Sequence, residues 1–553
     1  MPVRRGSFAP LRIRLFALLM TVQLVNATAV WAHVVTVQWT LTARGASATV
    51  VSLAPAAIAL PFLLLSLPVG AVVGFASRGR LLFTSAVASA LTSLLSALLG
   101  RTEDVHWAWL VTTVLVVGTA LVITGVTWQA MIPTLVRREL LGSASVIDGS
   151  VYNVARAVGP LLAGLGLGLV GVSGIFLAVA MVFVACAAVL ATVEMRHPNP
   201  RGVRRPIVPE MLAGLQFARY SPWTRGLLTR MACFGLPASA LWALASLVVH
   251  DRIGLGSGGF GVMMALIGSG GVIATFVLPR LRDVLSVSVF AAVFSGLYGV
   301  TLLVLGLVTS SLVVGIVMML GGVAWVAVQS TWMMLAQQAL PEWVRPRVIA
   351  LLLFLFQGTQ AVGALLWGVA ADLLGLPGAL VAAAAGTALS IVVLLWRGLG
   401  SSRGIEPDLA APDHGVIALV DEALARHGDG ALQVRYHYRV AAPQTEALVA
   451  AMEALRLARL RLGAIRWRLD PPAPGQDIWT ESYQVPDPHT LRSQETERLT
   501  VPENRLRFAV RELASRVEGP LLAPIRTPSA TPGAAGQVPH GPDPASTLEG
   551  ERA

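Results

Sequence analysis

Apolar residues fill most of the first 400 positions of the chain, in runs separated by short segments that carry arginine, glycine and proline. A membrane-spanning helix needs about 20 predominantly apolar residues. The runs therefore predict an all-α membrane region with twelve spans, at approximately 15–40, 48–76, 80–100, 106–133, 145–170, 172–193, 226–249, 258–279, 285–308, 311–339, 347–371 and 376–396.

The pattern changes after residue 400. Residues 432–440 alternate between apolar and polar side chains, as expected for a half-buried strand. A helical stretch follows at 443–462, then strand-like runs at 464–469 and 478–485, and helical segments near 487–498 and 503–514. This order predicts a small soluble α+β domain. It resembles the ferredoxin-like dimeric α/β-barrel of small monooxygenases, which would allow dimerisation through 431–514.

These patterns divide the chain into six parts. We expect an N-terminal six-helix bundle at 1–195, a cytoplasmic central loop at 196–225, a C-terminal six-helix bundle at 226–400, a linker at 401–430, the α+β domain at 431–514 and a disordered, proline-rich tail at 515–553. Arg4, Arg5 and the run Leu15–Met20 resemble a secretory signal, but apolar character continues through Val30–Trp39 and favours an uncleaved first span.

Charge placement sets an orientation. The chain has 41 basic and 30 acidic residues, and its basic excess belongs to the hydrophobic part, so it indicates membrane topology more than nucleic-acid binding. With the N-terminus inside, the inner segments and the central loop hold nearly all the arginines, whereas the outer loops hold only Arg44, Arg101 and Arg252. This asymmetry predicts a multi-pass protein of the cell (cytoplasmic) membrane with both termini cytoplasmic.

The membrane part contains an internal repeat. Val158–Gly164 recurs as Val362–Gly368 at an offset of 204, and two shorter matches, from Arg78–Arg80 to Arg280–Arg282 and from Pro133–Arg137 to Pro341–Arg345, occur in the same order at similar offsets. Two parallel six-helix halves of this kind are a transporter arrangement, with the substrate handled between the halves.

Several motifs make the chain resemble the major facilitator superfamily, and within it the transmembrane secretion effectors, a drug- and siderophore-exporter-like branch. They are Gly70 to Arg80, Gln129 to Arg137 leading into Asn153–Pro160, Leu278–Arg280 and Pro341–Arg347. The resemblance implies the major facilitator fold and export by alternating access. The superfamily places an acidic residue where Gly74 stands, so the latch that this acid forms must be weaker here or use another partner.

Polar residues inside the spans are the candidates for chemistry. Arg156 is the strongest, because an ionisable group inside a span usually faces the bundle interior or a water-filled cavity. Asp148 lies eight residues before it on the same helix face, which leaves open either a functional site or a structural ion pair. We expect the substrate pathway to include Asn26, Gln129, Asn153, Arg156, Gln357 and Gln360.

Gating and proton coupling involve further residues. The Gly159-Pro160 pair resembles the fifth-helix signature of the superfamily's antiporters, although close helix packing would also explain it. The gating candidates are Gly70, Arg78, Arg80, Gly159, Pro160, Arg280 and Arg282. The candidates for proton coupling are His33 and Asp148, since a histidine titrates near neutral pH and an acid can carry a proton.

No nucleotide-binding loop, dinucleotide-binding turn or metal-spaced His/Cys cluster occurs, so we expect no cofactor, no metal and no enzymatic activity. The favoured function is a secondary active transporter that exports a small molecule, such as a drug, siderophore or secondary metabolite, in exchange for protons. The alternative is a membrane-anchored enzyme or sensor in which the C-terminal α+β domain carries the activity. The expected partners are the lipid bilayer, a small-molecule substrate and protons.

Overall fold

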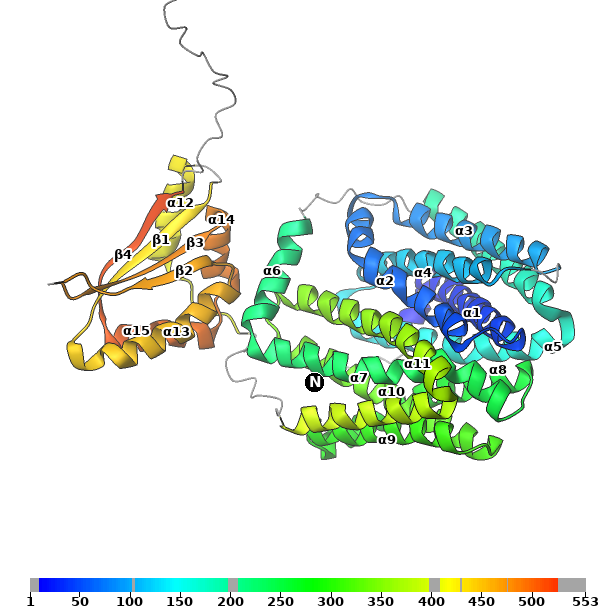
Figure 1. The fold of residues 1–553 in the computed structure, drawn as a ribbon. Coiled ribbons are helices and arrows are strands. Elements are labelled where there is room, and N and C mark those ends of the chain that lie inside the picture. The colour runs from blue at the N-terminus through cyan, green and yellow to red at the C-terminus, as the bar shows by residue number, and fades with distance from the viewer. Residues whose placement is uncertain are drawn as a thin grey trace, which may run out of the picture. The chain divides into compact units, whose positions relative to one another are not determined.

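The computed structural model describes residues 9–101, 105–196, 207–396, 408–427, 430–474 and 476–525 (Figure 1). They form two compact units. The membrane unit comprises the described residues up to Ala410 together with Thr500–Arg505, and the C-terminal unit comprises those of 411–499 and from Leu506 onward. Each unit has its own hydrophobic core.

The membrane unit is built from helices, as its apolar runs predict. Ten helices among the described residues are long and apolar enough to cross a membrane. They are α1 (Arg14–Ala43), α2 (Ala48–Phe75), α3 (Arg78–Leu99), α4 (Trp107–Leu135), α5 (Leu141–Arg196), α7 (Pro222–Leu247), α8 (Ser257–Val284), α9 (Val287–Leu307), α10 (Ser311–Ala339) and α11 (Arg345–Trp396).

Two of these helices are much longer than a bilayer requires. α5 has 56 residues and α11 has 52, and each contains one residue with non-helical backbone angles, Gly171 (φ 68°) and Gly375 (φ 74°). Glycine adopts positive φ without the steric penalty that a β-carbon brings, so each helix changes direction at its glycine. The fifth and sixth expected spans lie in α5, and the eleventh and twelfth lie in α11.

The central segment differs from the expected loop. Residues 196–225 include a short helix, α6 (Ile207–Tyr220), and α7 begins at Pro222 instead of residue 226. Phe217 of α6 is buried, with its ring 5.7 Å from that of Trp343. The sequence pattern missed this helix because its stability comes from packing on a distant segment, which local composition does not encode.

The two halves of the membrane unit, α1–α5 and α7–α11, meet through residues separated by the repeat offset. Gln38 Nε2 on α1 donates to the Trp242 carbonyl on α7 at 3.0 Å, and Thr42 Oγ1 donates to Ser246 Oγ at 2.8 Å. Each pair is 204 positions apart, as are Gly171 and Gly375. Equivalent positions of a repeat meet in this way when the two copies are related by an axis between them.

Glycines allow close approach between the halves. A β-carbon on Gly164 of α5 would lie 2.5 Å from Gly261 Cα of α8, and one on Gly368 of α11 would lie 2.0 Å from Ser52 Oγ of α2. Small residues bring helix backbones together in this way within membranes.

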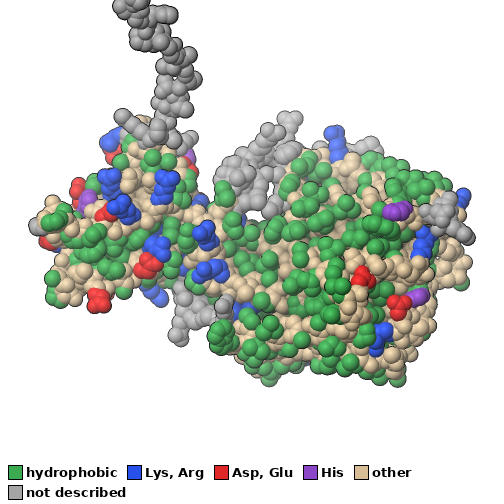
Figure 2. All heavy atoms as spheres, in the orientation of Figure 1, with side chains coloured by type: hydrophobic (Ala, Val, Ile, Leu, Met, Phe, Trp, Pro, Cys, Tyr) green, Lys and Arg blue, Asp and Glu red, His purple; other side chains and the backbone are tan. Residues whose placement is uncertain are grey.

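The surface of the membrane unit is hydrophobic. Figure 2 shows apolar side chains over much of its visible face, and large ones such as Leu169, Phe276 and Leu373 are mostly exposed. A soluble protein rarely leaves so much contiguous apolar surface uncovered, which fits a multi-pass membrane protein.

The C-terminal unit contains a four-stranded antiparallel sheet with the order β2-β3-β1-β4. The strands are β1 (Leu432–Arg439), β2 (Ile465–Asp470), β3 (Ile478–Val485) and β4 (Ser515–Pro524). The helices are α12 (His414–His427), α13 (Thr445–Arg461), α14 (Pro488–Ser493) and, from Leu506 onward, α15 (Val501–Leu513). Alternate residues of β1 point into a core shared with α12, α13 and α15, as the period of two predicts.

Two segments of this unit differ from expectation. Helix α12 lies within the expected linker at 401–430, and strand β4 occupies the start of the expected tail at 515–553. Among the described strands, β4 lies at the edge of the sheet and pairs with β1 alone, and Pro520 lies where the register shifts. Prolines are tolerated at edges and irregularities of a sheet. The proline-rich composition, which led to the prediction of a disordered tail, is therefore compatible with a strand at this position. Residues 526–553 lie outside the described part of the chain.

Candidate functional site

Arg156 lies among three aromatic rings contributed by both halves. Its guanidinium carbon is 5.3 Å from the ring centroid of Tyr152 on α5, 5.8 Å from that of Trp31 on α1 and 5.6 Å from that of Trp242 on α7. A cation over aromatic faces is stabilised by the ring quadrupole, more so where water is scarce. We call Arg156 and these three rings the arginine cage.

The cage leaves the charge of Arg156 without an acidic partner. Arg156 Nη2 donates to Asn153 Oδ1 at 3.3 Å, whereas Arg156 Nε has no hydrogen-bond partner. In the described part of the chain, no Asp or Glu forms an ion pair with it. Aromatic rings offset only part of the cost of desolvating a guanidinium. The described contacts therefore leave the positive charge of Arg156 uncompensated.

Gly159 explains why Trp31 can reach the arginine. A β-carbon at Gly159 would lie 2.6 Å from the Thr28 carbonyl and 2.8 Å from Trp31 Cβ, so α1 and α5 touch one turn beyond Arg156. This contact sets Trp31 edge-on to Tyr152, with centroids 6.2 Å apart. Close packing, one of the two roles expected of the Gly159-Pro160 pair, is thus present at Gly159.

A small cavity of about 190 Å³ adjoins the cage, where α5 faces α8 and α10. Its lining includes Asn153 and Arg156 of α5, Gly268 and Gly271 of α8, and Trp325 of α10. Trp325 also packs against Trp242, with centroids 5.8 Å apart. The cavity therefore combines one cation, one amide and an apolar aromatic wall, a composition typical of small-molecule sites.

Asp148 is a second buried charge on α5, and it is not paired with Arg156. Its carboxylate is 9% exposed and accepts hydrogen bonds from Gln23 Nε2 (3.1 Å), Trp128 Nε1 (2.9 Å) and Gln129 Nε2 (2.9 Å). All three donors are neutral. The structural ion pair considered from the sequence is therefore absent, and Asp148 is held in a separate polar pocket.

The other expected pathway residues lie further from the cage. Gln360 Nε2 donates to the Gly235 carbonyl of α7 at 3.3 Å, and Gln129 contacts Asp148 instead of Arg156. Asn26 on α1 and Gln357 on α11 are half-buried and do not line the cavity beside Arg156. Of the six pathway candidates, only Asn153 and Arg156 are brought together there.

His33 lies inside the N-terminal half. It is fully buried, with Nδ1 3.1 Å from Ser93 Oγ and Nε2 3.0 Å from Thr113 Oγ1, and its ring lies 4.9 Å from that of Phe176. Both ring nitrogens thus have hydroxyl partners from neighbouring helices. This arrangement ties α1 to α3 and α4 and keeps His33 out of the lining of the cavity.

Among the gating candidates, Arg282 contacts a neighbouring helix of the second half. Arg282 Nη2 donates to Ser330 Oγ of α10 at 2.6 Å, and the guanidinium carbon lies 5.2 Å from the Phe290 ring centroid. Arg280 Nη1 donates to the Phe276 carbonyl within its own helix. In the first half Arg78 is half-buried, and Gly70 and Arg80 are exposed.

Sequence reasoning missed Asp372, although it is the only acidic residue of α11. Its carboxylate accepts hydrogen bonds from the backbone amides of Ala48 (2.8 Å) and Thr49 (3.0 Å) and from Thr49 Oγ1 (2.5 Å). These amides are the unpaired donors at the N-terminus of α2, where an anion is favoured. Asp372 therefore joins the two halves at the end that carries the α1–α2 loop.

Trp31 is a second residue that sequence reasoning missed. Its signal in the sequence is faint, a lone aromatic in the small-residue stretch Ala27–Ala32 of the first span. Tryptophans are common at membrane interfaces, so the residue type alone does not mark Trp31, Trp242 or Trp325 as part of a site.

The sequence profile of the transmembrane secretion effector family matches residues 5–524. An uncharacterized MFS-type transporter, y4rN, of Sinorhizobium fredii (strain NBRC 101917 / NGR234) is 30% identical over 149 residues. That match covers 26% of this chain and 36% of the relative, so the chain spans little more than a third of the length of this curated relative.

Among solved structures, the fold is similar to a bacterial homologue of the human lysosomal transporter Spinster in an inward-facing, unoccupied conformation. The TM-score is 0.57 at 12% identity, covering 72% of this chain and 98% of that one. The nucleoside transporter NupG gives 0.55 at 9% identity, covering 69% and 98%. A POT family transporter in complex with a thioalcohol-conjugated peptide gives 0.56 at 12% identity, covering 69% and 96%. At these identities the likeness concerns the fold alone.

Proposed function

The chain belongs to the transmembrane secretion effector family of MFS-type transporters, and on this premise we propose that it exports a small organic molecule across the cytoplasmic membrane by alternating access. The observation that carries this proposal is the arginine cage, a cation without an acidic partner among the described residues, set between the two halves of a transporter fold. The two halves would rock about this site, exposing it to each side of the membrane in turn.

The same proposal includes twelve spans. α5 and α11 would each be about 80 Å long if straight, more than twice the roughly 30 Å of hydrocarbon in a bilayer. Each therefore crosses, turns at Gly171 or Gly375 and crosses back. Twelve crossings place both termini on one side, and the arginine asymmetry assigns that side to the cytoplasm.

The substrate would carry a negative group and an apolar or aromatic body. Arg156 and Asn153 offer hydrogen-bond donors to an oxyanion, while Trp31, Trp242 and Trp325 offer flat apolar surfaces. Drugs, siderophores and secondary metabolites include many such compounds. A neutral or cationic substrate would leave the charge of Arg156 uncompensated in a region where that is costly.

Asp372 and the glycine contacts would close the external end in this conformation. The bonds from Asp372 to Ala48 and Thr49 and the Thr42–Ser246 bond all lie at the end of the α1–α2 loop, which is external in the proposed orientation. A site closed on the outside loads from the cytoplasm, as an exporter requires. The Gly159-Pro160 pair, similar to that of antiporters, points the same way.

Proton coupling is assigned to Asp148. It is a buried acid that no cation neutralises within the described residues, so a proton is the simplest partner for its charge. It lies two helical turns from Arg156 on α5, close enough for the charge of a bound anion to influence its protonation.

Transport into inside-out vesicles tests the proposal. Radiolabelled 2-naphthoate serves as the anionic aromatic probe, and uptake driven by respiration should be collapsed by a protonophore. Arg156→Ala should reduce uptake to the level of empty vesicles with unchanged protein abundance, while Arg156→Lys, which keeps the charge, should retain part of it. If Arg156→Ala transports the probe like the unmodified protein, the cage is not the substrate site.

A further inference from the structure

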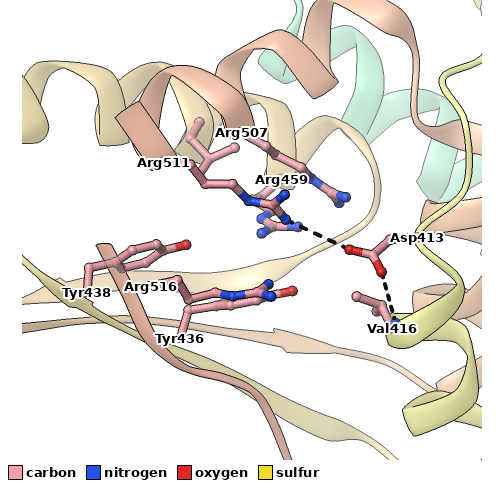
Figure 3. Close-up of a pocket in the computed structure, with 9 residues that line it drawn as sticks. Asp413, Val416, Tyr436, Tyr438, Arg459, Arg507, Arg511 and Arg516 are labelled. Atoms are coloured by element: carbon pink, nitrogen blue, oxygen red, sulfur yellow. Dashed lines mark hydrogen bonds and ion pairs between the residues drawn. The ribbon is translucent and has the colours of Figure 1, made fainter. Parts of the chain in front are cut away.

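The C-terminal unit contains a pocket that transport does not explain. Four arginines line it, Arg459 from α13, Arg507 and Arg511 from α15 and Arg516 from β4, together with the rings of Tyr436 and Tyr438 on β1 (Figure 3). Asp413, Val416 and Leu455 complete the lining, and the space that these residues surround, which includes open solvent, measures about 340 Å³.

Two of the four arginines are held by buried acids. Arg507 makes a two-pronged contact with Glu495, with nitrogen–oxygen distances of 2.7 and 2.6 Å. Arg459 contacts Glu481 at 3.3 Å, and Glu481 also accepts from Tyr438 Oη and Trp467 Nε1. These pairs fix the inner wall of the pocket and leave little net charge there.

The outer pair supplies an excess of positive charge. Arg511 is exposed and reaches only one oxygen of Asp413, at 3.8 Å, which is long for a hydrogen bond. Arg516 is also exposed, and the described residues give it no acidic partner. Figure 3 shows Arg511 and Arg516 among the residues that line the pocket, with a dashed line from Arg511 to Asp413.

A buried donor in the same wall is unused. Arg459 is 3% exposed, yet its Nη1 has no hydrogen-bond partner. Its guanidinium carbon lies 5.2 Å from the Tyr436 ring centroid and 4.8 Å from that of Tyr483, so the group is fixed in place. A buried guanidinium donor without a partner is costly, and a bound oxyanion would satisfy it.

We propose that this pocket binds a small organic anion, with a carboxylate or phosphate group held by Arg459, Arg511 and Arg516 and a flat apolar body against Tyr436 and Tyr438. Arginine suits such ligands because its planar fork matches the oxygens of both groups and its face stacks on rings. The site is separate from the arginine cage and gives the C-terminal unit a ligand of its own.

The tyrosines of the pocket stay uncharged across the neutral pH range. Burial raises the pKa of the Tyr438 phenol well above its ordinary value, and the neighbouring Glu481 carboxylate raises it further. Burial likewise raises the pKa of the Tyr483 phenol. Both phenols therefore stay neutral, and no phenolate forms to repel an anion.

Calorimetric titration of the full chain in detergent tests the proposal. The background is Arg156→Ala, so that the arginine cage does not bind the probe. The probes are 2-naphthoate, 2-naphthyl phosphate and, as an uncharged control, 2-naphthalenemethanol. Both anions, or one of the two, should bind, and the alcohol should bind at least about tenfold more weakly, as expected for losing charge-assisted hydrogen bonds.

A matched pair of variants locates the binding. R511Q/R516Q removes two exposed charges from the pocket and should weaken anion binding at least about tenfold. R435Q/R439Q removes two exposed charges from the other face of β1 and should change the Kd less than about twofold, both variants keeping the parent melting temperature. Equal losses in both variants, equally tight binding of the alcohol, or no binding of either anion would overturn the proposal.

Discussion

Arg156 in the membrane unit and Arg459 in the C-terminal unit are both set against aromatic rings, but their charges are treated differently. Arg459 lies over Tyr436 and Tyr483 and is paired with Glu481. Arg156 lies among Trp31, Tyr152 and Trp242, and its hydrogen bond goes to the amide oxygen of Asn153. An aromatic environment therefore does not by itself indicate a binding site.

The two arginines differ in whether a carboxylate pairs with them. Glu481 offsets the cost of burying Arg459, so the pair belongs to the core of its domain, and breaking it would leave a buried carboxylate behind. Within the described residues no acid offsets the cost of burying Arg156, so replacing this arginine leaves no buried carboxylate without a partner. The proposed function explains this unpaired cation as the binding site for an anionic substrate. Asp148 is likewise a buried charge without an oppositely charged partner among the described residues, but its charge is negative.

The largest effect on stability is expected at the paired arginine. Arg459→Ala leaves Glu481 buried with its charge unmatched, and we expect the C-terminal unit to lose about 3–5 kcal/mol of stability. Limited proteolysis of the full chain against urea concentration would measure the loss as earlier cleavage within 411–525. Arg456→Ala, on the exposed side of α13, is the control and should shift the midpoint little. A midpoint equal to that of the control would show that the pair is not structural.

A smaller structural effect and a large functional one are expected at Asp148. Asp148→Asn keeps the shape and can still accept from Gln23 and Trp128 through its oxygen, so stability should change by about 1 kcal/mol or less. The amide cannot carry the proton, so the dependence of vesicle uptake on the pH gradient should disappear. Uptake that still follows the gradient in this variant would move coupling elsewhere, with His33→Asn as the next variant to measure.

The smallest stability change is expected at the unpaired arginine. Arg156→Met keeps much of the volume and removes a desolvated charge, so the membrane unit should be unchanged or stabilised by about 1 kcal/mol. Melting of the full chain in detergent, followed by cysteine labelling at Cys186, measures this. A large loss of stability would mean that Arg156 holds the helices together, and the contrast with Arg459 would fail.

Much of the fold could be read from the sequence because its signals are local. Apolar runs of span length place every helix from α1 to α11 except α6, and the period of two places β1 to within a residue. α6, α12 and β4 were missed, since each is stabilised by partners remote in the sequence and carries glycine, proline or charge that locally favours a loop.

For the candidate site, too, the sequence predicted the features that lie within one helix, and the tertiary structure showed the contacts between helices. The sequence by itself determined that Arg156 and Asp148 lie on one face of a membrane helix, because helical periodicity fixes which residues of one element share a face. Only the tertiary structure decided that Trp31 and Trp242 surround Arg156, that neutral donors hold Asp148, and that Asp372 binds the start of α2. Those partners come from other helices, and which residues meet depends on how closely glycines such as Gly159 let the helices approach.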